Sequence, residues 1–375
     1  MNLYEYQGKD AFSEGGIPVP RGIVVSSSDE LAAAADEVGM PCVVKAQVLH
    51  GGRGKAGLIQ MAGSREELNE KADRIWSETP DGTQLLLEEK LRVERELYVA
   101  VTPDPASASA LFMLSARGGV DIEQLAATEP DSILKESVHV FHGMMPFHVR
   151  NMVGPLGLDK AAGKAVGKVA GNLYNVFRGC DATLAEINPL VLTADGRAVA
   201  ADAKLVIDDN ALYRQPFERV REGFTNDVEY EAAEEGIPYL QFDGDIGLMC
   251  AGAGLTNTVY DLIHYFGGKP ANFLEFGGPN YRKALEAMRL TLKSNASVIL
   301  IVTFGTIARA DVMAEGVANA IKELKPTVPI VTAIRGTNEE KAADILRGVD
   351  LEPLQDTEEA VKKAVELAAR QRGES

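Results

Sequence analysis

The chain has 375 residues, of which 46% are hydrophobic and 25% are charged, as in ordinary globular proteins large enough for two domains. Its formal net charge of −17 argues against a nucleic-acid partner, because phosphate backbones repel an acidic surface. The longest apolar run, residues 298–302, is too short to span a membrane and predicts a buried strand. We therefore expect a protein that contacts neither nucleic acid nor membrane.

The N-terminus and the cysteines both indicate a cytoplasmic protein. Residues 1–7 lack the basic and apolar regions of a signal peptide. Cys42, Cys180 and Cys250 are far apart in the sequence and lie among apolar residues. This pattern argues against a disulfide framework or a zinc site, and it fits a reducing compartment.

The first half of the chain alternates strand-like and helix-like segments. The expected strands are residues 22–25, 43–48, 85–87, 97–101 and 111–114. A long helix is expected over residues 160–178, and a hairpin around Asp195-Gly196 follows it. Residues 208–236 are polar and lack strong periodicity, so we place the domain boundary at their end, which gives domains of residues 1–236 and 237–375.

The second half has a regular repeat of strands and helices. Strands are expected near residues 245–250, 271–276, 298–304, 329–334 and 349–352, with helices between them. Five short apolar strands that alternate with helices predict an α/β domain with a doubly wound parallel sheet of flavodoxin-like type. Ligands of such sheets gather at the C-terminal ends of the strands.

A glycine-rich loop at residues 51–57 follows the strand pattern at 43–48. The loop offers free backbone N–H groups and room for phosphates, and Lys45, Arg53 and Lys55 surround it with positive charge. It is not a Walker A loop, since no Gly-Lys-Ser or Gly-Lys-Thr opens a helix. On these residues alone, a mobile surface loop is an equally good interpretation.

The hairpin around Gly196 carries a second polar cluster. If its loop has three residues with Gly196 left-handed, residue 188 faces 202 and residue 186 faces 204. Glu186, Asn188, Asp202 and Lys204 then share one face, and the oxygens of Asn188 and Asp202 suit a Mg²⁺ ion that also binds substrate phosphates. A two-residue turn would instead place Asn188 and Asp202 on opposite faces.

Five segments resemble, in order, the β subunit of succinyl-CoA synthetase. They are residues 2–7 (NLYEYQ), 44–57 (which contain VKAQV and GGRGKAG), 118–123 (GGVDIE), 186–191 (EINPLV) and 208–214 (DDNALYR). The resemblance covers essentially the whole chain and is highly specific. It implies an ATP-grasp fold for the first domain, with ATP as a substrate and Mg²⁺ as a cofactor.

The resemblance also implies roles for individual residues of the first domain. The matching positions are Lys45, Gly52, Arg53 and Gly54 for the phosphates, Glu88, Leu91 and Glu96 for the rest of the nucleotide, and Asn188 and Asp202 for Mg²⁺. Leu91 can offer only its backbone to a polar contact.

The mechanism of this family requires a partner subunit. ATP phosphorylates a histidine of an α subunit that also binds CoA; the phosphohistidine then phosphorylates a small carboxylic acid, and CoA displaces the phosphate. Glu186, the candidate catalytic residue, resembles the carboxylate that orients this histidine and favours its cationic form. The chain's own histidines lack the glycine-rich, helix-capping context of such a nucleophile, and we expect surface or packing roles for His50, His139, His142, His148 and His264.

In the second domain the resemblance implies two turns near the acid. Gly277 and Gly278 precede a helix that faces the phosphohistidine, where free N–H groups and the helix dipole favour an anion. Thr306, Ile307 and Ala308 match a loop that binds the acid's carboxylate through backbone N–H groups. Taken alone, both segments are typical of plain tight turns.

Departures from the family cluster at the acid site. Ala251 replaces an asparagine that contacts the acid, Thr306 replaces a glycine, and Arg335-Gly336 replaces an Arg-x-x-Gly pattern. Several of these changes resemble ATP-citrate lyase and citryl-CoA synthetase, and Arg335 could pair with an additional carboxylate. Succinate, and with it the tricarboxylic acid cycle, is the default expectation, with citrate, malate or another small acid as alternatives.

Three other functions compete with this one. A self-sufficient ATP-grasp carboxylate–amine ligase would have no use for the second domain. A non-catalytic relative would not need Lys45, Glu186, Asn188 and Asp202 together. A dinucleotide-binding protein is suggested only by Gly252-x-Gly254, which lacks the third glycine of that motif.

Overall fold

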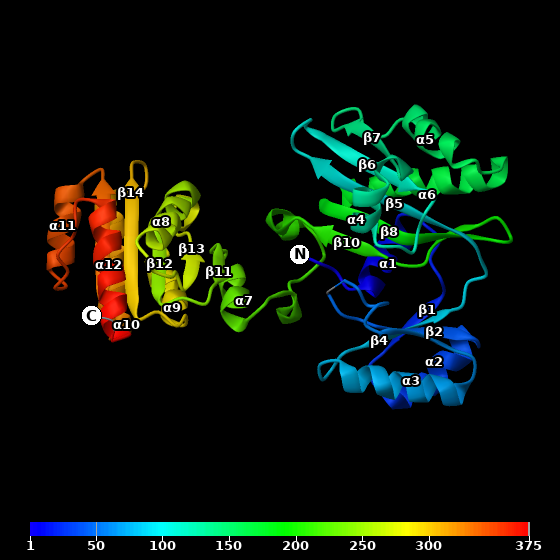
Figure 1. Ribbon diagram of the computed structural model, residues 1–375, viewed down its shortest axis with the longest axis horizontal. Helices are drawn as coiled ribbons and strands as arrows, with labels where there is room; N and C mark the ends of the chain where they lie inside the picture. The colour runs from blue at the N-terminus through cyan, green and yellow to red at the C-terminus, as the bar shows by residue number, and fades with distance from the viewer. Residues whose placement is uncertain (50, 374–375) are drawn as a thin grey trace. The chain divides into compact units, whose positions relative to one another are not determined.

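The computed structural model describes residues 1–49 and 51–373, which form two compact units, Met1–Arg219 and Val220–Ser375 (Figure 1). The boundary that we placed at residue 236 falls inside the second of these units. Helix α7 (Asp227–Glu234) belongs to the second unit because Ala232 packs into the same core as Leu274. The polar segment 208–236 is therefore divided between the two units.

A four-stranded antiparallel sheet, in the order β1-β4-β2-β3, lies at one side of the first unit. Strand residues Val44, Leu85 and Leu87 are buried against Leu31 of α2 and Ile75 of α3, and these two helices cover one face of the sheet (Figure 1). The elements are β1 (Gly22–Val25), α2 (Ser28–Val38), β2 (Cys42–Ala46), β3 (Ile59–Ala62), α3 (Arg65–Glu78) and β4 (Leu85–Glu89). The glycine-rich loop lies in the connection from β2, which contains Lys45, to β3.

The second sheet of this unit has the strand order β10-β8-β5-β6-β7, with β9 also paired to β8. Val169 and Leu173 of α6 and Phe12 of α1 pack into its core. The elements are α1 (Glu5–Glu14), β5 (Val93–Asp104), β6 (Ser109–Ser115), α4 (Ile122–Thr128), η1 (Pro130–Ser132), β7 (Ile133–His139), α5 (Pro146–Val153), η2 (Gly154–Leu156), α6 (Lys160–Gly179), β8 (Ala182–Thr193), β9 (Ala198–Ala200), β10 (Lys204–Ile207) and η3 (Asp209–Arg214).

The hairpin has the register of the three-residue loop, one of the two alternatives that the sequence left open. The chain reverses over residues 194–196, where Gly196 has a φ of +80° and Thr193 N–H donates to the Arg197 carbonyl. Glu186 then pairs with Lys204. The three-residue loop is therefore confirmed, and position 202 lies opposite position 188 in the short break between β9 and β10.

The second unit is built around a parallel sheet with the order β12-β14-β15. Successive residues of β14 point into two different cores: Ile299 and Ile301 face α9 and α10, whereas Leu300 and Val302 face α8 and α12. Helices thus cover both faces, as expected for a doubly wound sheet (Figure 1). The elements are η4 (Arg221–Gly223), β11 (Tyr239–Gln241), β12 (Ile246–Ala251), α8 (Ala253–Tyr265), β13 (Asn272–Leu274), η5 (Gly278–Asn280), α9 (Ala284–Leu292), β14 (Val298–Gly305), α10 (Ala310–Leu324), β15 (Ile330–Gly336), α11 (Glu339–Arg347) and α12 (Thr357–Gln371).

Two of the five strands expected in the second unit differ from the prediction. The strand expected at 271–276 is shortened to β13, which pairs antiparallel with β11, while the flanking residues Pro270 and Glu275 form isolated parallel bridges to β12. The strand expected at 349–352 is wrong. The N–H groups of Val349 and Leu351 donate to the Leu346 carbonyl at the end of α11, and Asp350 has a φ of +59°, so these residues form a turn.

Across the described part of the chain, none of the helices combines the length and the apolar character needed to cross a membrane.

Candidate functional site

A cavity of about 730 Å³ opens in the first unit, between residues of its two sheets. Every residue of this unit to which the sequence assigned a binding or catalytic role lines the cavity: Lys45, Gly52, Arg53, Gly54, Glu88, Leu91, Glu96, Glu186, Asn188 and Asp202. They come from β2, the glycine-rich loop, β4 and its following turn, β5 and the β8–β10 hairpin. The fold therefore brings together segments that are up to about 150 residues apart.

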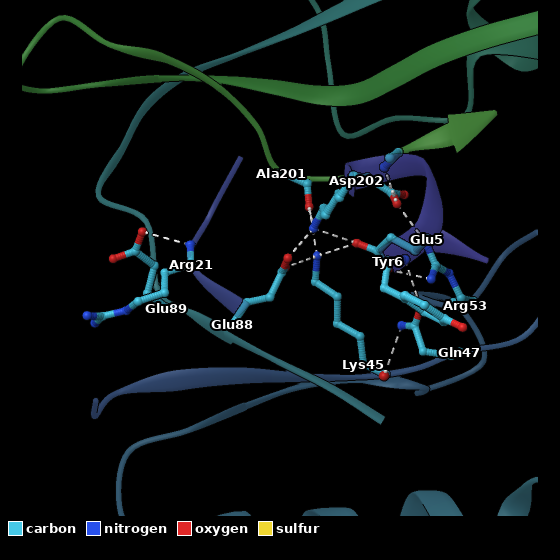
Figure 2. Close-up of polar contacts among 12 residues, drawn as sticks. Glu5, Tyr6, Arg21, Lys45, Gln47, Arg53, Glu88, Glu89, Ala201 and Asp202 are labelled. Atoms are coloured by element: carbon cyan, nitrogen blue, oxygen red, sulfur yellow. Dashed lines mark hydrogen bonds and ion pairs between the residues drawn. The ribbon is translucent and has the colours of Figure 1, made fainter. Parts of the chain in front are cut away.

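Lys45 is the central cation of this cavity. Its ammonium group, Nζ, lies 2.8 Å from Glu5 Oε1 and 2.7 Å from Glu88 Oε2. It also donates a 2.7 Å hydrogen bond to the Ala201 carbonyl, next to Asp202 (Figure 2). Burial works against the charge of this lysine, but the surrounding carboxylates outweigh burial and raise the pKa of Lys45 above its usual value. Lys45 is therefore a permanent positive charge directed at the cavity.

The sequence analysis missed two charged residues of the first helix, α1. Glu5 and Lys9 are 2% and 4% exposed, and their charged ends form an ion pair of 2.8 Å one helical turn apart. Lys9 also pairs with Glu88 and donates to the Ala201 carbonyl at 3.0 Å. A signal was present in the sequence, because Glu5 and Lys9 share one helix face with Phe12, which is fully buried.

Arg53 connects the glycine-rich loop to helix α1 and to the β8–β10 hairpin. Its guanidinium lies 2.5 Å from Glu5 Oε2 and 2.7 Å from Asp202 Oδ1, and Figure 2 shows its side chain beside Glu5. Burial alone would raise the pKa of Glu5, but Lys45, Lys9 and Arg53 together hold it well below its usual value. These two ion pairs hold the loop against the cavity. The alternative interpretation, a mobile surface loop, does not include such contacts.

Asn188 and Asp202 supply the oxygen atoms that a metal ion would need. Asn188 accepts a 2.7 Å hydrogen bond from Gly119 N–H and donates to the Val120 carbonyl, which fixes the orientation of its amide. Within residues 1–49 and 51–373, no group of three or more His, Cys, Asp or Glu side chains forms a closed metal cage. Two side-chain oxygens at a cavity of about 730 Å³ would suit Mg²⁺, which completes its shell with substrate phosphates and water.

Glu186 lines the same cavity, two residues before Asn188 and next to the break between β9 and β10. It accepts a 3.2 Å hydrogen bond from the Tyr98 hydroxyl and pairs across the sheet with Lys204. Burial raises the pKa of Glu186, although Lys204 and the Tyr98 hydrogen bond oppose this rise. Four of the chain's histidines belong to the described residues and none of these lines the cavity, whereas His50 lies outside the described residues.

In the second unit, the predicted acid-site residues gather at one edge of the parallel sheet. Ala251 ends β12, Phe304 pairs with Arg335 near the ends of β14 and β15, and the loop of Thr306, Ile307 and Ala308 follows β14. This edge is formed by the C-terminal ends of the strands, where ligands of such sheets bind. At this edge the large apolar side chain of Ile307 is 97% exposed to solvent.

The turn at Gly277 differs from the expectation in two ways. Gly277 N–H and Gly252 N–H both donate to Glu275 Oε1, at 2.7 and 2.8 Å, so neither donor is free. The glycines also lead into the short 3-10 helix η5, and α9 begins only at Ala284. A carboxylate of the chain itself therefore occupies the Gly277 N–H, one of the groups that we expected to face an anion.

Arg335 is held within its own strand–helix connection. Its guanidinium forms a two-point ion pair with Glu339, with Nε at 2.8 Å and Nη2 at 3.3 Å, and it also donates to the Gln355 carbonyl. An acid substrate at this edge would share the arginine with Glu339.

Comparisons with known proteins agree with this arrangement. Residues 2–192 match the family model of the ATP-grasp domain, and residues 249–367 match that of CoA-ligase. The chain is 54% identical over 370 residues to the ADP-forming sulfoacetate-CoA ligase subunit SauC of Bilophila wadsworthia, covering 98% of this chain and 99% of that one. It is 50% identical over 369 residues to the sulfoacetate-CoA ligase subunit SqwK of an Acholeplasma species, covering 98% and 92%.

More distant relatives carry the name that the sequence analysis expected. The chain is 41% identical over 389 residues to the ADP-forming succinate–CoA ligase subunit beta of Halorhodospira halophila, covering 99% of this chain and 100% of the relative. A solved ATP citrate lyase from Methanothrix soehngenii covers 97% of this chain and 99% of its own, with a TM-score of 0.72. At 19% identity, this last similarity concerns the fold alone.

The fold and the cavity define an ATP-grasp ligase with a CoA-ligase domain. The chain belongs to the family of ADP-forming acid–CoA ligases and is one subunit of such a heteromeric enzyme. The predicted fold class and enzyme class are confirmed, and the match of residues 249–367 to CoA-ligase argues against the carboxylate–amine ligase alternative, which has no use for the second unit. The comparisons do not support the expected place in the tricarboxylic acid cycle, since the two more similar relatives are named for sulfoacetate.

Proposed function

We propose that the chain is the ATP-binding β subunit of an ADP-forming sulfoacetate–CoA ligase. The observation that carries the proposal is the meeting of Lys45, Arg53, Asn188 and Asp202 at one cavity. The names of the relatives with 54% and 50% identity support sulfoacetate as the acid.

Phosphoryl transfer from ATP is the first step that this cavity would support. Lys45 and Arg53 would hold the phosphates, exchanging part of their pairing with Glu5, Glu88 and Asp202 for the phosphate oxygens. Asn188 and Asp202 would hold Mg²⁺, which when bound neutralises charge on the transferring phosphate. This combination orients the terminal phosphate towards an incoming nucleophile.

The nucleophile would be a histidine of the partner α subunit. Glu186 lines the cavity and is fixed by Tyr98, so it could accept a hydrogen bond from one imidazole nitrogen while the other attacks the phosphate. The phosphorylated histidine would then pass the phosphoryl group to the acid's carboxylate, and the CoA thiol would displace phosphate from that acyl phosphate.

Residue changes at the acid edge are consistent with a sulfonate. Sulfoacetate carries a tetrahedral group with three oxygens where succinate has a planar carboxylate. Ala251 offers more room than the asparagine of the succinate enzymes, and Thr306 adds a hydroxyl to a loop that otherwise uses backbone donors. Arg335 would provide positive charge at the same edge.

Succinate is the second candidate, because the relatives with about 40% identity are named for it. Co-expression of the chain with its α subunit, followed by measurement of CoA-dependent ADP release, distinguishes the two acids. We expect kcat/KM for sulfoacetate to exceed that for succinate, malate and citrate by at least about tenfold. A preference for succinate would restore the original expectation, and the absence of ADP release with every acid would remove the proposed function.

A further inference from the structure

Helix α1 supplies the buried counter-charges of the nucleotide cavity. Glu5 contacts three cations, with Oε1 at 2.8 Å from both Lys45 and Lys9 and Oε2 at 2.5 Å from Arg53. Its side chain is only 1% exposed. Three positive groups that meet at one buried carboxylate would repel one another without it.

Lys9 lies behind this arrangement rather than in the cavity. Glu5 and Glu88 are among the described residues that line the cavity, whereas Lys9 is not. Lys9 nevertheless pairs with both of these carboxylates, and its side chain is 5% exposed. Its effect on a bound nucleotide would therefore be indirect, through Glu5, Glu88 and the Ala201 carbonyl to which it donates a hydrogen bond.

The charges of the cluster balance. The cations Lys9, Lys45 and Arg53 face the carboxylates Glu5, Glu88 and Asp202. Removal of Lys9 would leave an excess negative charge beside the phosphate-binding groups. The two carboxylates would then compete more strongly with phosphate for Lys45.

We infer that Glu5 and Lys9 are positioning residues of the nucleotide site: Lys9 neutralises the buried carboxylates, and Glu5 holds Lys45 and Arg53 towards the cavity. This inference rests on the proposed function of the cavity. It assigns a role to the N-terminal helix, which contains none of the residues expected to touch nucleotide or metal.

The test uses Lys9→Met, which removes the charge and keeps the length, in the full chain co-purified with its α subunit. Calorimetry is expected to show about tenfold weaker binding of ATP and at most about threefold weaker binding of AMP, because the excess charge acts on the phosphates. Glu14→Gln, an exposed carboxylate of the same helix, is the matched control and is expected to change neither affinity.

The double variant Lys9→Met/Glu5→Gln restores the charge balance and separates the two roles. It is expected to bind ATP within about threefold of the parent chain, since a buried pair removed together leaves no unpaired charge. It is also expected to phosphorylate the partner histidine about tenfold more slowly, because Lys45 and Arg53 lose the group that orients them. If Lys9→Met does not fold, this variant alone carries the test.

Equal losses for ATP and AMP in Lys9→Met, or a double variant with unchanged phosphorylation, would overturn the inference. If the parent chain itself binds no ATP, the proposed function fails instead. The two failures are therefore distinguishable by the parent measurement.

Discussion

The cavity of the first unit and the strand edge of the second unit both collect groups suited to anions, but they use different parts of the chain. The cavity uses side-chain cations that are buried among carboxylates, with Lys45 in contact with Glu5 and Glu88. The strand edge uses glycine turns, where backbone N–H groups of Gly252 and Gly277 are bound by Glu275. In the cavity, side-chain cations are paired with carboxylates of the same chain. At the strand edge, backbone N–H groups are paired with a carboxylate of the same chain.

The two regions also differ in the solvent exposure of their side chains. The side chains of Lys45 and Glu5 are 9% and 1% exposed, whereas Phe304 and Ile307 at the strand edge are 65% and 97% exposed. Large apolar side chains at this exposure are typical of surfaces that a partner covers. Under the proposed function, we therefore expect the nucleotide to bind in the cavity of this subunit and the acid to bind where the α subunit covers the strand edge.

The largest expected effect is a loss of activity on substitution in the cavity of the first unit. Asp202→Ala removes a carboxylate that pairs with Arg53 and is proposed to hold Mg²⁺. We expect ATP-dependent phosphorylation of the partner histidine to fall by about 10³-fold, because charge stabilisation at the phosphate is lost. Labelling with γ-³²P-ATP measures this step, and Asp195→Ala, at the tip of the same hairpin, serves as the control. Normal labelling of Asp202→Ala would refute the metal assignment.

A second substitution disrupts the strand edge of the second unit and leaves the cavity of the first unit intact. Gly336 has a φ of +117°, and a Cβ atom there would lie 1.9 Å from the Gly305 carbonyl oxygen at the end of β14. Gly336→Ala is expected to lower the free energy of unfolding of the second unit by about 2–4 kcal/mol. Acid-dependent ADP release should fall strongly while calorimetric ATP binding persists.

Gly171→Ala provides the matched control for that change. Gly171 lies within α6, and nothing lies within 4 Å of the Cβ that alanine would add. Because glycine weakens a helix interior, this substitution should stabilise the first unit by about 0.5–1 kcal/mol in urea unfolding. A similar destabilisation by both substitutions would show that the steric argument at Gly336 is wrong.

The smallest expected effect on activity concerns the choice of acid. Arg335→Ala removes the cation at the strand edge that Glu339 holds at 2.8 Å. We expect kcat/KM for sulfoacetate to fall about tenfold and the order of preference among acids to change, since the sulfonate loses a charged partner. An assay across sulfoacetate, succinate, malate and citrate measures this, with Arg347→Ala as an exposed control in the same unit. An unchanged order of acids would exclude Arg335 from acid recognition.

The sequence predicted those parts of the structure that depend on local patterns and on matching motifs. Hairpin geometry left a three-residue and a two-residue turn at Gly196 open, and the structure has the three-residue turn. Every first-domain residue to which the motifs assigned a role lines the cavity. The strand expected at 349–352 was wrong because short apolar runs also occur in turns that close a helix. Glu5 and Lys9 were missed because their i, i+4 pair is also typical of an exposed helix face, and only the distant partners Lys45 and Glu88 show that it is buried in the site.

One contact of the N-terminal segment has consequences for how the cavity forms. Leu3 N–H donates to the Leu205 carbonyl, and Asn2 bridges Val206, so residues from opposite ends of the first unit lie side by side. Closing a loop of this length costs conformational entropy, and the contacts that offset this cost form only when β10 is in place. A truncated chain that ends before β10 would retain the glycine-rich loop and Lys45 but lose the docking of α1, and with it the support of the site.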